Sequence, residues 1–168
     1  MHVIKIIITA LFLLITSSIS FAADASINPK YKITEKERTC LYLNAFFEGA
    51  TDTIAAHQGF IEVVANRRIS EDYPNDMCRV IYDDSAFSWT IRKRPVHNNE
   101  KYIMALIQIT VDGIIDGLQR GAIREITFTA DHYHADYVTP CWIKDMKLTN
   151  VLGAHKFYKQ VKRTGACG

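Results

Sequence analysis

One carboxyl group in this sequence could act as a proton donor. Glu48 directly follows Phe46 and Phe47. A free glutamic acid titrates near pH ~4.3, so it can donate a proton at neutral pH only where burial raises its pKa. The two phenylalanines could supply such apolar surroundings. The alternative is an ordinary surface glutamate at the end of a helix, so position alone does not assign a catalytic role to Glu48.

A second group of side chains could bind a metal ion. It consists of Asp131, His132, His134 and His155. A His-x-His pair on a strand places both imidazoles on one face of the sheet. Catalytic zinc needs a third protein ligand and an open coordination position. The alternative, packed and hydrogen-bonded histidines, is favoured, so we predict neither a metal ion nor another cofactor.

The first element that must position these residues is a helix ending near Glu48. Thr34 is followed three residues later by Glu37, which is the form of a capping box. A helix should therefore run from there to about Phe47, and Gly49 is a plausible stop signal. Glu48 then lies at the helix end, where its side chain can face a cleft.

Further elements follow from spacing. A second helix, with caps available in residues 51–53, should extend through about Arg67, and a third should run from Glu100 to Arg120, where apolar residues recur at helical intervals. Residues 70–98 are rich in turn formers, and residues 126–130 alternate like a short strand. We expect an irregular tail with a short helix near His155. The predicted fold is a mostly helical α+β domain.

The N-terminus predicts export. Lys5 precedes an apolar run, and Ser20 and Ala22 form the small-x-small pattern of a cleavage site, so residues 1–22 read as a signal peptide. We expect a loose leader over 23–33, one catalytic domain over 34–168, a secreted or periplasmic location and no membrane contact once the signal is removed. A retained N-terminal anchor is the alternative.

Net charge and cysteine content narrow the class of protein further. The chain has 20 Lys and Arg against 18 Asp and Glu, which argues against a nucleic-acid partner. Export makes disulfides the default for its four cysteines, and these permit three pairings that the sequence does not distinguish. The cysteines are Cys40, Cys78, Cys141 and Cys167.

Seven segments, in order, resemble the SleB-type cell-wall hydrolases, a family first known from spore-cortex lytic enzymes. They are Glu48-Gly49-Ala50-Thr51-Asp52, Asn66-Arg67, Tyr73-Pro74-Asn75-Asp76-Met77-Cys78-Arg79-Val80-Ile81-Tyr82, Ala86-Phe87-Ser88-Trp89, His132-Tyr133-His134-Ala135, Pro140-Cys141-Trp142 and Leu152-Gly153-Ala154-His155-Lys156-Phe157-Tyr158. No single segment is specific, but their shared order and spacing over residues 38–158 is. Two places depart from the family pattern: Gly49-Ala50-Thr51-Asp52 replaces A-R-G-E, and Phe128-Thr129 stands where a glycine pair is usual.

The resemblance implies a lysozyme-like (lytic transglycosylase-like) fold and cleavage of the MurNAc–GlcNAc β-1,4 bond of peptidoglycan, with Glu48 as the catalytic acid. Glycosidases commonly use a second carboxylate, for which Asp52 is the nearest candidate, although a helix cap is the favoured role for that residue. The resemblance also suggests lytic transglycosylation, which leaves 1,6-anhydro-MurNAc ends and needs only one carboxylate.

We expect aromatic faces and polar side chains to bind the glycan. The candidates are Asn66, Tyr82, Phe87, Trp89, Tyr133, His134, Trp142 and His155. Two other functions stay open at this point: a zinc-dependent peptidoglycan amidase or peptidase using the histidines, and a wall-binding module without catalysis. We expect the protein to act as a monomer on peptidoglycan glycan strands.

Overall fold

The computed structural model describes residues 27–84, 86–92 and 94–161. Its elements, in chain order, are η1 (Pro29–Tyr31), α2 (Glu35–Gly49), α3 (Ile54–Arg68), α4 (Met77–Ile81), α5 (Ser88–Arg92), η2 (Asn98–Glu100), α6 (Lys101–Gln119), β1 (His132–Ala135), η3 (Cys141–Asp145), β2 (Met146–Leu152) and β3 (His155–Gln160). The mostly helical α+β class is therefore confirmed. The predicted signal peptide lies outside the described residues.

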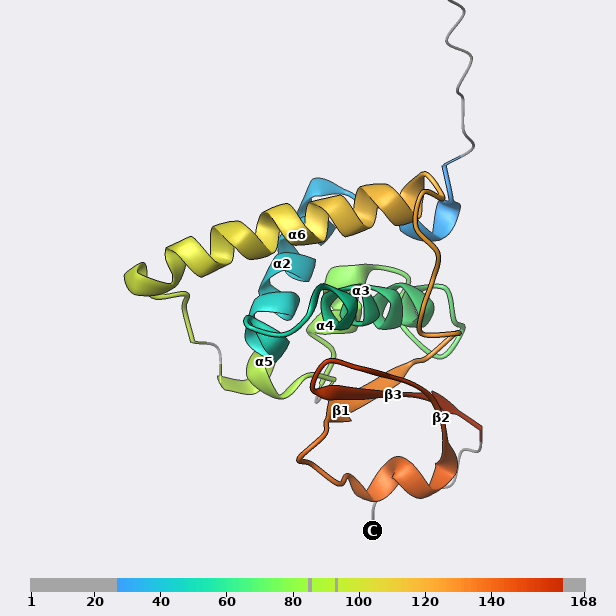
Figure 1. Ribbon diagram of the computed structural model, residues 1–168. Coiled ribbons are helices and arrows are strands. Elements are labelled where there is room, and N and C mark those ends of the chain that lie inside the picture. Colours follow the sequence, from blue (N-terminus) through green and yellow to red (C-terminus); the bar gives the residue numbers. More distant parts are fainter. Residues whose placement is uncertain (1–26, 85, 93, 162–168) are drawn as a thin grey trace, which may run out of the picture.

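Three layers make up the domain. Figure 1 shows α6 along one side, α2 and α3 in the middle, and the small sheet on the opposite side. The central helix α3 is buried on almost every face, from Ala56 to Arg67. A helix enclosed on all sides needs small residues where neighbours come close. At Gly59 an added Cβ would lie 2.5 Å from the Phe157 ring of the sheet, so glycine is required there.

The predicted capping box at the start of α2 is confirmed. The Thr34 side chain accepts a hydrogen bond from the Glu37 backbone N–H, and the Glu37 carboxylate accepts one from the Thr34 N–H. The helix continues two residues past the predicted end, through Gly49, so that Glu48 belongs to its last turn. The long helix α6 also follows the prediction within one residue at each end.

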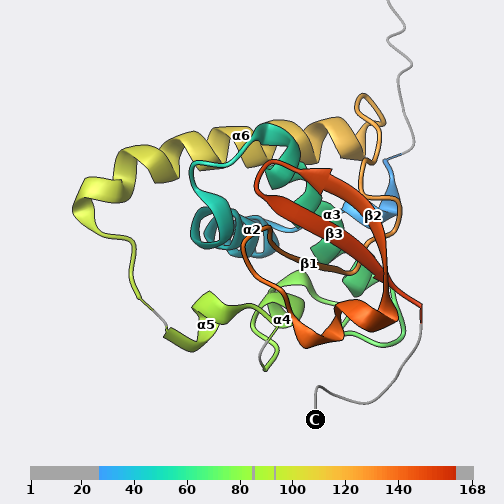
Figure 2. The same cartoon turned by 60° about the horizontal axis from the view of Figure 1, so that its bottom comes forward.

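The sheet has three antiparallel strands in the order β1-β3-β2, with β3 paired to both neighbours (Figure 2). In the register of β1 and β3, Tyr133 lies opposite Phe157 and Ala135 opposite His155. The prediction of an irregular tail with a helix near His155 is wrong, because β2 and β3 form a hairpin there. Gly153, at φ 55°, supplies the left-handed turn.

The predicted strand over residues 126–130 is also wrong, because these residues form a turn. The Glu62 carboxylate accepts the backbone N–H groups of Ile126 and Thr127, which are then not available to a neighbouring strand. Phe128 and Thr129 have φ values of 49° and 70°, a left-handed conformation that favours glycine. This explains why a glycine pair suits these two positions.

The part of the expected leader that the structure describes is packed rather than loose. Tyr31 is fully buried in the main core, and the Asn28 N–H donates to the Gln119 carbonyl at the end of α6. The domain therefore begins several residues before Thr34. The free energy gained by burying the Tyr31 ring is larger than the preference of the surrounding polar residues for solvent.

A disulfide joins Cys40 of α2 to Cys78 of α4. It settles the pairing of these two cysteines, whereas Cys167 lies outside the described residues. Across the described part of the chain, no helix has both the length and the apolar character that spanning a membrane requires.

Candidate active site

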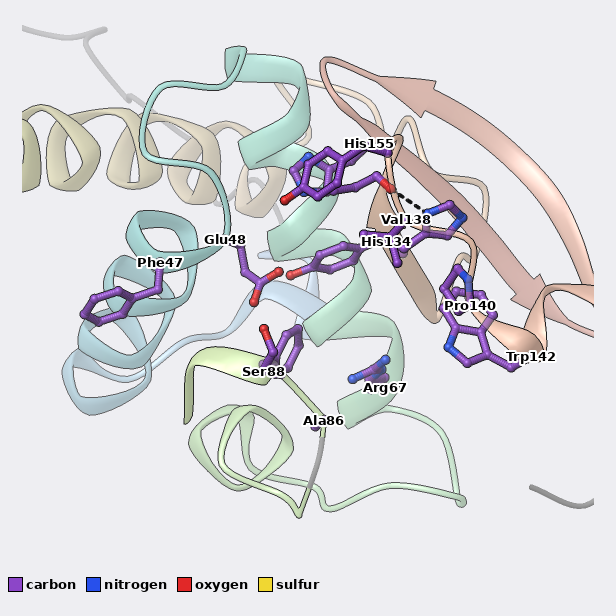
Figure 3. A pocket seen from close by; sticks show the side chains of 14 residues that line it. Phe47, Glu48, Arg67, Ala86, Ser88, His134, Val138, Pro140, Trp142 and His155 are labelled. Atoms are coloured by element: carbon purple, nitrogen blue, oxygen red, sulfur yellow. Dashed lines mark hydrogen bonds between the residues drawn. The ribbon is translucent and has the colours of Figure 1, made fainter. Parts of the chain in front are cut away.

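Glu48 lies in a cleft of about 330 Å³ between the helices and the sheet. Figure 3 shows its side chain leaving the end of α2 and entering the space bounded by Ser88, Arg67 and His134. Burial raises the pKa of Glu48 to about 7, although a hydrogen bond from Tyr133 and the positive charge of Arg67 act in the opposite direction. At neutral pH a large share of this group is therefore protonated, as a general acid requires.

The Tyr133 hydroxyl connects the sheet to Glu48. This side chain extends from β1 and donates a hydrogen bond to the Glu48 carboxyl group. The same hydroxyl accepts a hydrogen bond from the Asn44 amide at 3.5 Å. The Trp89 indole N–H donates to the Asn44 carbonyl oxygen at 3.0 Å. One chain of hydrogen bonds thus runs from Trp89 through Asn44 and Tyr133 to the acid.

Arg67 is a charged group in the wall of the cleft. The residue is 6% exposed, and its Nε–H donates to the Asp131 carbonyl at 2.6 Å. The guanidinium group lies 5.2 Å from the centre of the Phe87 ring and 5.3 Å from that of Tyr73. These contacts hold a positive charge near Glu48 without a direct ion pair, which would favour the carboxylate too strongly for an acid.

Asp52 and His155 form a buried pair beside the cleft. Their side chains are 8% and 7% exposed, and Oδ2 of Asp52 lies 2.8 Å from Nδ1 of His155. Burial opposes ionisation of Asp52, but hydrogen bonds from the Thr53 N–H, from His155 and from the Ala154 N–H outweigh it and lower its pKa. Asp52 therefore ties the α2–α3 junction to the β2–β3 turn.

The favoured role of Asp52 as a helix cap is wrong. Thr53 is the N-cap of α3, and its hydroxyl accepts from the Ala56 N–H at 3.1 Å. Asp52 precedes the cap and bonds across to the hairpin instead. The hairpin turn fits around this carboxylate so closely that a Cβ on Gly153 would lie 1.8 Å from Oδ1 of Asp52.

The remaining histidines are held by hydrogen bonds. Both ring nitrogens of His134 are engaged, Nδ1 by the Ala135 carbonyl at 2.7 Å and Nε2 by the Tyr158 hydroxyl at 3.0 Å. Nδ1 of His132 lies 2.8 Å from Asp131. Within the described residues, no three His, Cys, Asp or Glu side chains come together as metal ligands. The histidines thus offer no zinc centre for an amidase in this part of the chain.

The structure brings most of the predicted site residues together. Glu48 shares its cleft with Phe87, Tyr133, His134, Trp142 and His155. Tyr82 and Trp89 line an adjoining hollow that shares Phe47 with the cleft. Asn66 does not line either space. Its amide is buried and donates to the Ala130 carbonyl at 2.7 Å, which supports the turn before β1.

Two residues that shape the site were not predicted as site residues. Arg67 lies in the cleft wall, and Asn44 contacts Tyr133 of the cleft and Trp89 of the adjoining hollow. Asn44 could have been suspected, because it precedes Glu48 by one helical turn and so shares its face of α2. The Asn66-Arg67 segment singled out Arg67 in the sequence, but its place in the cleft wall depends on contacts with residues distant in sequence.

Residues 54–158 match the family model described as Cell Wall Hydrolase. The chain belongs to this family. As a member of the cell wall hydrolase family, the protein is a peptidoglycan-degrading enzyme. The matched range begins after Glu48, so the case for that residue depends on the geometry of the cleft and on its place in the ordered segments.

Solved structures agree on the fold. The catalytic domain of the Bacillus cereus SleB protein has a TM-score of 0.54 at 19% identity, covering 79% of this chain and 98% of that domain. The catalytic domain of the germination-specific lytic transglycosylase SleB from Bacillus anthracis has a TM-score of 0.57 at 20% identity, covering 76% and 98%. The predicted SleB-type, lysozyme-like fold is therefore confirmed. No curated protein sequence matches the chain.

Proposed function

We propose that this cell wall hydrolase is a lytic transglycosylase that cleaves the MurNAc–GlcNAc β-1,4 bond with Glu48 as its single catalytic carboxyl group. The observation that carries the proposal is a carboxyl group in a cleft, with a pKa of about 7. Such a group is protonated often enough to act as an acid and ionised often enough to act as a base. The glycan would lie along the cleft, against Phe87, Tyr133 and Trp142.

The reaction would proceed in two proton transfers. Glu48 first gives its proton to the glycosidic oxygen as the bond from C1 of MurNAc to that oxygen breaks, which releases the 4-hydroxyl of GlcNAc. The Glu48 carboxylate then removes the proton from the C6 hydroxyl of the same MurNAc. That oxygen bonds to C1 and closes the 1,6-anhydro ring. Glu48 ends protonated, as it began.

The state of Asp52 supports the single-carboxylate route. In a hydrolysis, a second carboxylate must activate water or attack C1. The oxygens of Asp52 already accept from the Thr53 and Ala154 N–H groups and contact His155. A carboxylate with these partners is poorly suited to attack a sugar carbon. We therefore assign Asp52 a structural role and leave the acid and base steps to Glu48.

The test is the identity of the products. Purified peptidoglycan is digested with the wild-type protein and with Glu48→Gln, and the soluble fragments are identified by mass spectrometry. Anhydro-muropeptides from the wild type and none from the variant support the proposal. Fragments with reducing ends would replace it with hydrolysis, and free stem peptides would indicate an amidase. A variant that digests at the wild-type rate would remove Glu48 from the mechanism.

We further propose that the protein acts on the wall outside the cytoplasmic membrane, secreted or periplasmic, and as a monomer. The support is its peptidoglycan-degrading family and the Cys40–Cys78 disulfide, since disulfides persist in oxidising compartments. Size-exclusion chromatography with light scattering tests the monomer, and fractionation of the producing cells tests the location.

A further inference from the structure

Asn44 is a buried polar side chain directly behind the proposed acid. It lies on α2 one helical turn before Glu48 and is 1% exposed. Its carbonyl oxygen accepts from the Trp89 indole N–H at 3.0 Å, and its NH₂ group donates to the Tyr133 hydroxyl at 3.5 Å. Because the indole can only donate, it fixes which end of the amide faces Trp89 and which faces Tyr133.

This arrangement sets the direction of the Tyr133 hydroxyl proton. A tyrosine hydroxyl has one proton to donate, and here the Asn44 amide donates to its oxygen. The hydroxyl proton is left for Glu48, to which Tyr133 donates. We propose that Asn44 is a positioning residue that acts through Tyr133 to determine which carboxyl oxygen of Glu48 carries the catalytic proton. The proposal rests on the function proposed above for Glu48.

The chemical consequence concerns the two oxygens of one carboxyl group. The oxygen that accepts from Tyr133 has a lone pair engaged, so protonation favours the other oxygen. The proton is then held where the glycosidic oxygen can reach it. In the second step the same oxygen, now free of its proton, accepts the proton of the C6 hydroxyl. A hydroxyl free to rotate would leave the proton distributed over both oxygens.

The other groups around Glu48 do not replace this control. Arg67 of α3 contributes a positive charge, but its Nε–H donates to the Asp131 carbonyl. His134 of β1 has both ring nitrogens engaged, and His155 of β3 is held by Asp52. These contacts do not involve Asn44, so its replacement should change the Tyr133 hydrogen bond and leave the charges around the acid in place.

The decisive variant is Asn44→Leu, which has a similar size and removes both hydrogen bonds. We expect kcat to fall about tenfold, the effect of one hydrogen bond in the transition state, with KM changed less than twofold. The alkaline limb of the kcat profile should move to higher pH, because a weaker bond from Tyr133 no longer lowers the Glu48 pKa as far. A purely structural role would lower the amount of active protein without moving that limb.

Asn150→Leu is a matched control. The Asn150 amide also bridges two partners, the Ile126 carbonyl and the Val151 N–H, but it lies in β2 outside the cleft. This variant should lower the melting temperature and leave the alkaline limb where it is. The proposal is overturned if Asn44→Leu has the wild-type kcat and pH profile, or if Asn150→Leu moves the limb equally.

A second variant keeps the test valid if Asn44→Leu does not fold. Asn44→Asp still accepts from Trp89 but cannot donate to Tyr133, whose hydroxyl would turn toward the new carboxylate. Asn44→Asp should move the alkaline limb to higher pH by a larger amount when Tyr133 is present than when Tyr133 is replaced by Phe. In the Tyr133→Phe background only the added negative charge acts on Glu48. Equal shifts in both backgrounds would overturn the proposal. If Glu48→Gln loses activity while the Asn44 variants keep the wild-type kcat and pH profile, the proposed function stands and only this inference is removed.

Discussion

Two buried glutamates in this domain show what separates a reactive carboxyl group from a structural one. Glu62 of α3 is fully buried and accepts hydrogen bonds from the Gln58 amide, the Ile126 and Thr127 N–H groups and the Thr127 hydroxyl. Glu48 of α2 is partly buried and has Tyr133 as its donor. A buried carboxyl group that accepts hydrogen bonds from many donors holds a loop in place. A buried carboxyl group with one donor keeps a proton available at neutral pH.

The largest effect should come from removing the reactive carboxyl group. Glu48→Gln keeps the shape of the side chain but cannot donate a proton to the leaving oxygen. We expect the rate of peptidoglycan solubilisation to fall about 10³-fold, within the range of general acid catalysis. The measurement is the decrease in turbidity of a peptidoglycan suspension, and far-UV circular dichroism should match the wild type. Retention of more than a tenth of the activity would contradict the comparison.

The same comparison predicts a stability effect at Glu62. Glu62→Leu leaves the Ile126 and Thr127 N–H groups and the Thr127 hydroxyl without their acceptor in a buried site. The free energy of unfolding should fall by about 3 kcal/mol or more, measured by urea denaturation. Glu71→Leu is the control, because Glu71 is exposed in the turn after α3 and should change stability by less than about 0.5 kcal/mol. Similar losses in the two variants would mean that the Glu62 hydrogen bonds contribute little.

A third prediction concerns the pH dependence of stability. The Glu48 pKa is raised from 4.5 to about 7 in the folded state. Folding is therefore favoured by protonation of this group, and that contribution is present below pH 4.5 and lost as the pH rises through 7. Glu48→Gln should remove the loss, so at pH 8 the variant should be more stable than the wild type by up to about 3 kcal/mol. Unfolding curves at pH 5 and pH 8 measure the difference, and a variant that gains nothing at pH 8 would contradict the raised pKa.

The smallest expected effect is at the turn that Glu62 holds. Thr129 has a φ of 70° and is exposed. Thr129→Gly should raise the free energy of unfolding by up to about 1 kcal/mol, because glycine adopts this conformation without strain. Thr129→Ala keeps a Cβ atom and should bring no such gain. Equal stability of the two variants, determined in the same urea titration, would show that the turn carries no backbone strain.

The sequence predicted the three long helices well because their signals are local, whereas the short helices α4 and α5 lie within residues 70–98, where the sequence predicted turns. The capping residues Thr34 and Glu37 and the apolar spacing within α6 depend only on near neighbours. The strand β2 was missed because its sequence lacks a clear alternation. A register irregularity falls between Leu148 and Asn150, and Leu148 and Val151 are about half exposed. Residues 126–130 alternate like a strand in the sequence. Glu62, which holds them in a turn, lies far away in the sequence on α3, so the local pattern does not indicate it.

The site residues also differ in how far the sequence could predict them. The ordered segments located Glu48, Phe87, Tyr133 and Trp142, and the structure gathers these residues around one cleft. The function of Asn44 depends on Trp89 and Tyr133, which lie 45 and 89 residues away in the chain. The role of Asp52 was mistaken because a carboxylate before a helix usually caps it, whereas here the neighbouring Thr53 does so.

The Cys40–Cys78 disulfide has a consequence for survival among proteases. The chain between the two cysteines carries Glu48, all of α3 and the turn that follows it, in which Glu71 and Asp72 are exposed. A protease that cuts this turn would break the backbone once, but the two pieces would stay covalently joined through sulfur. In the nicked enzyme the disulfide would keep the piece that carries α2 and α3 joined to the piece that carries α4, α6 and the sheet, and separating the two pieces would require reduction as well as cleavage.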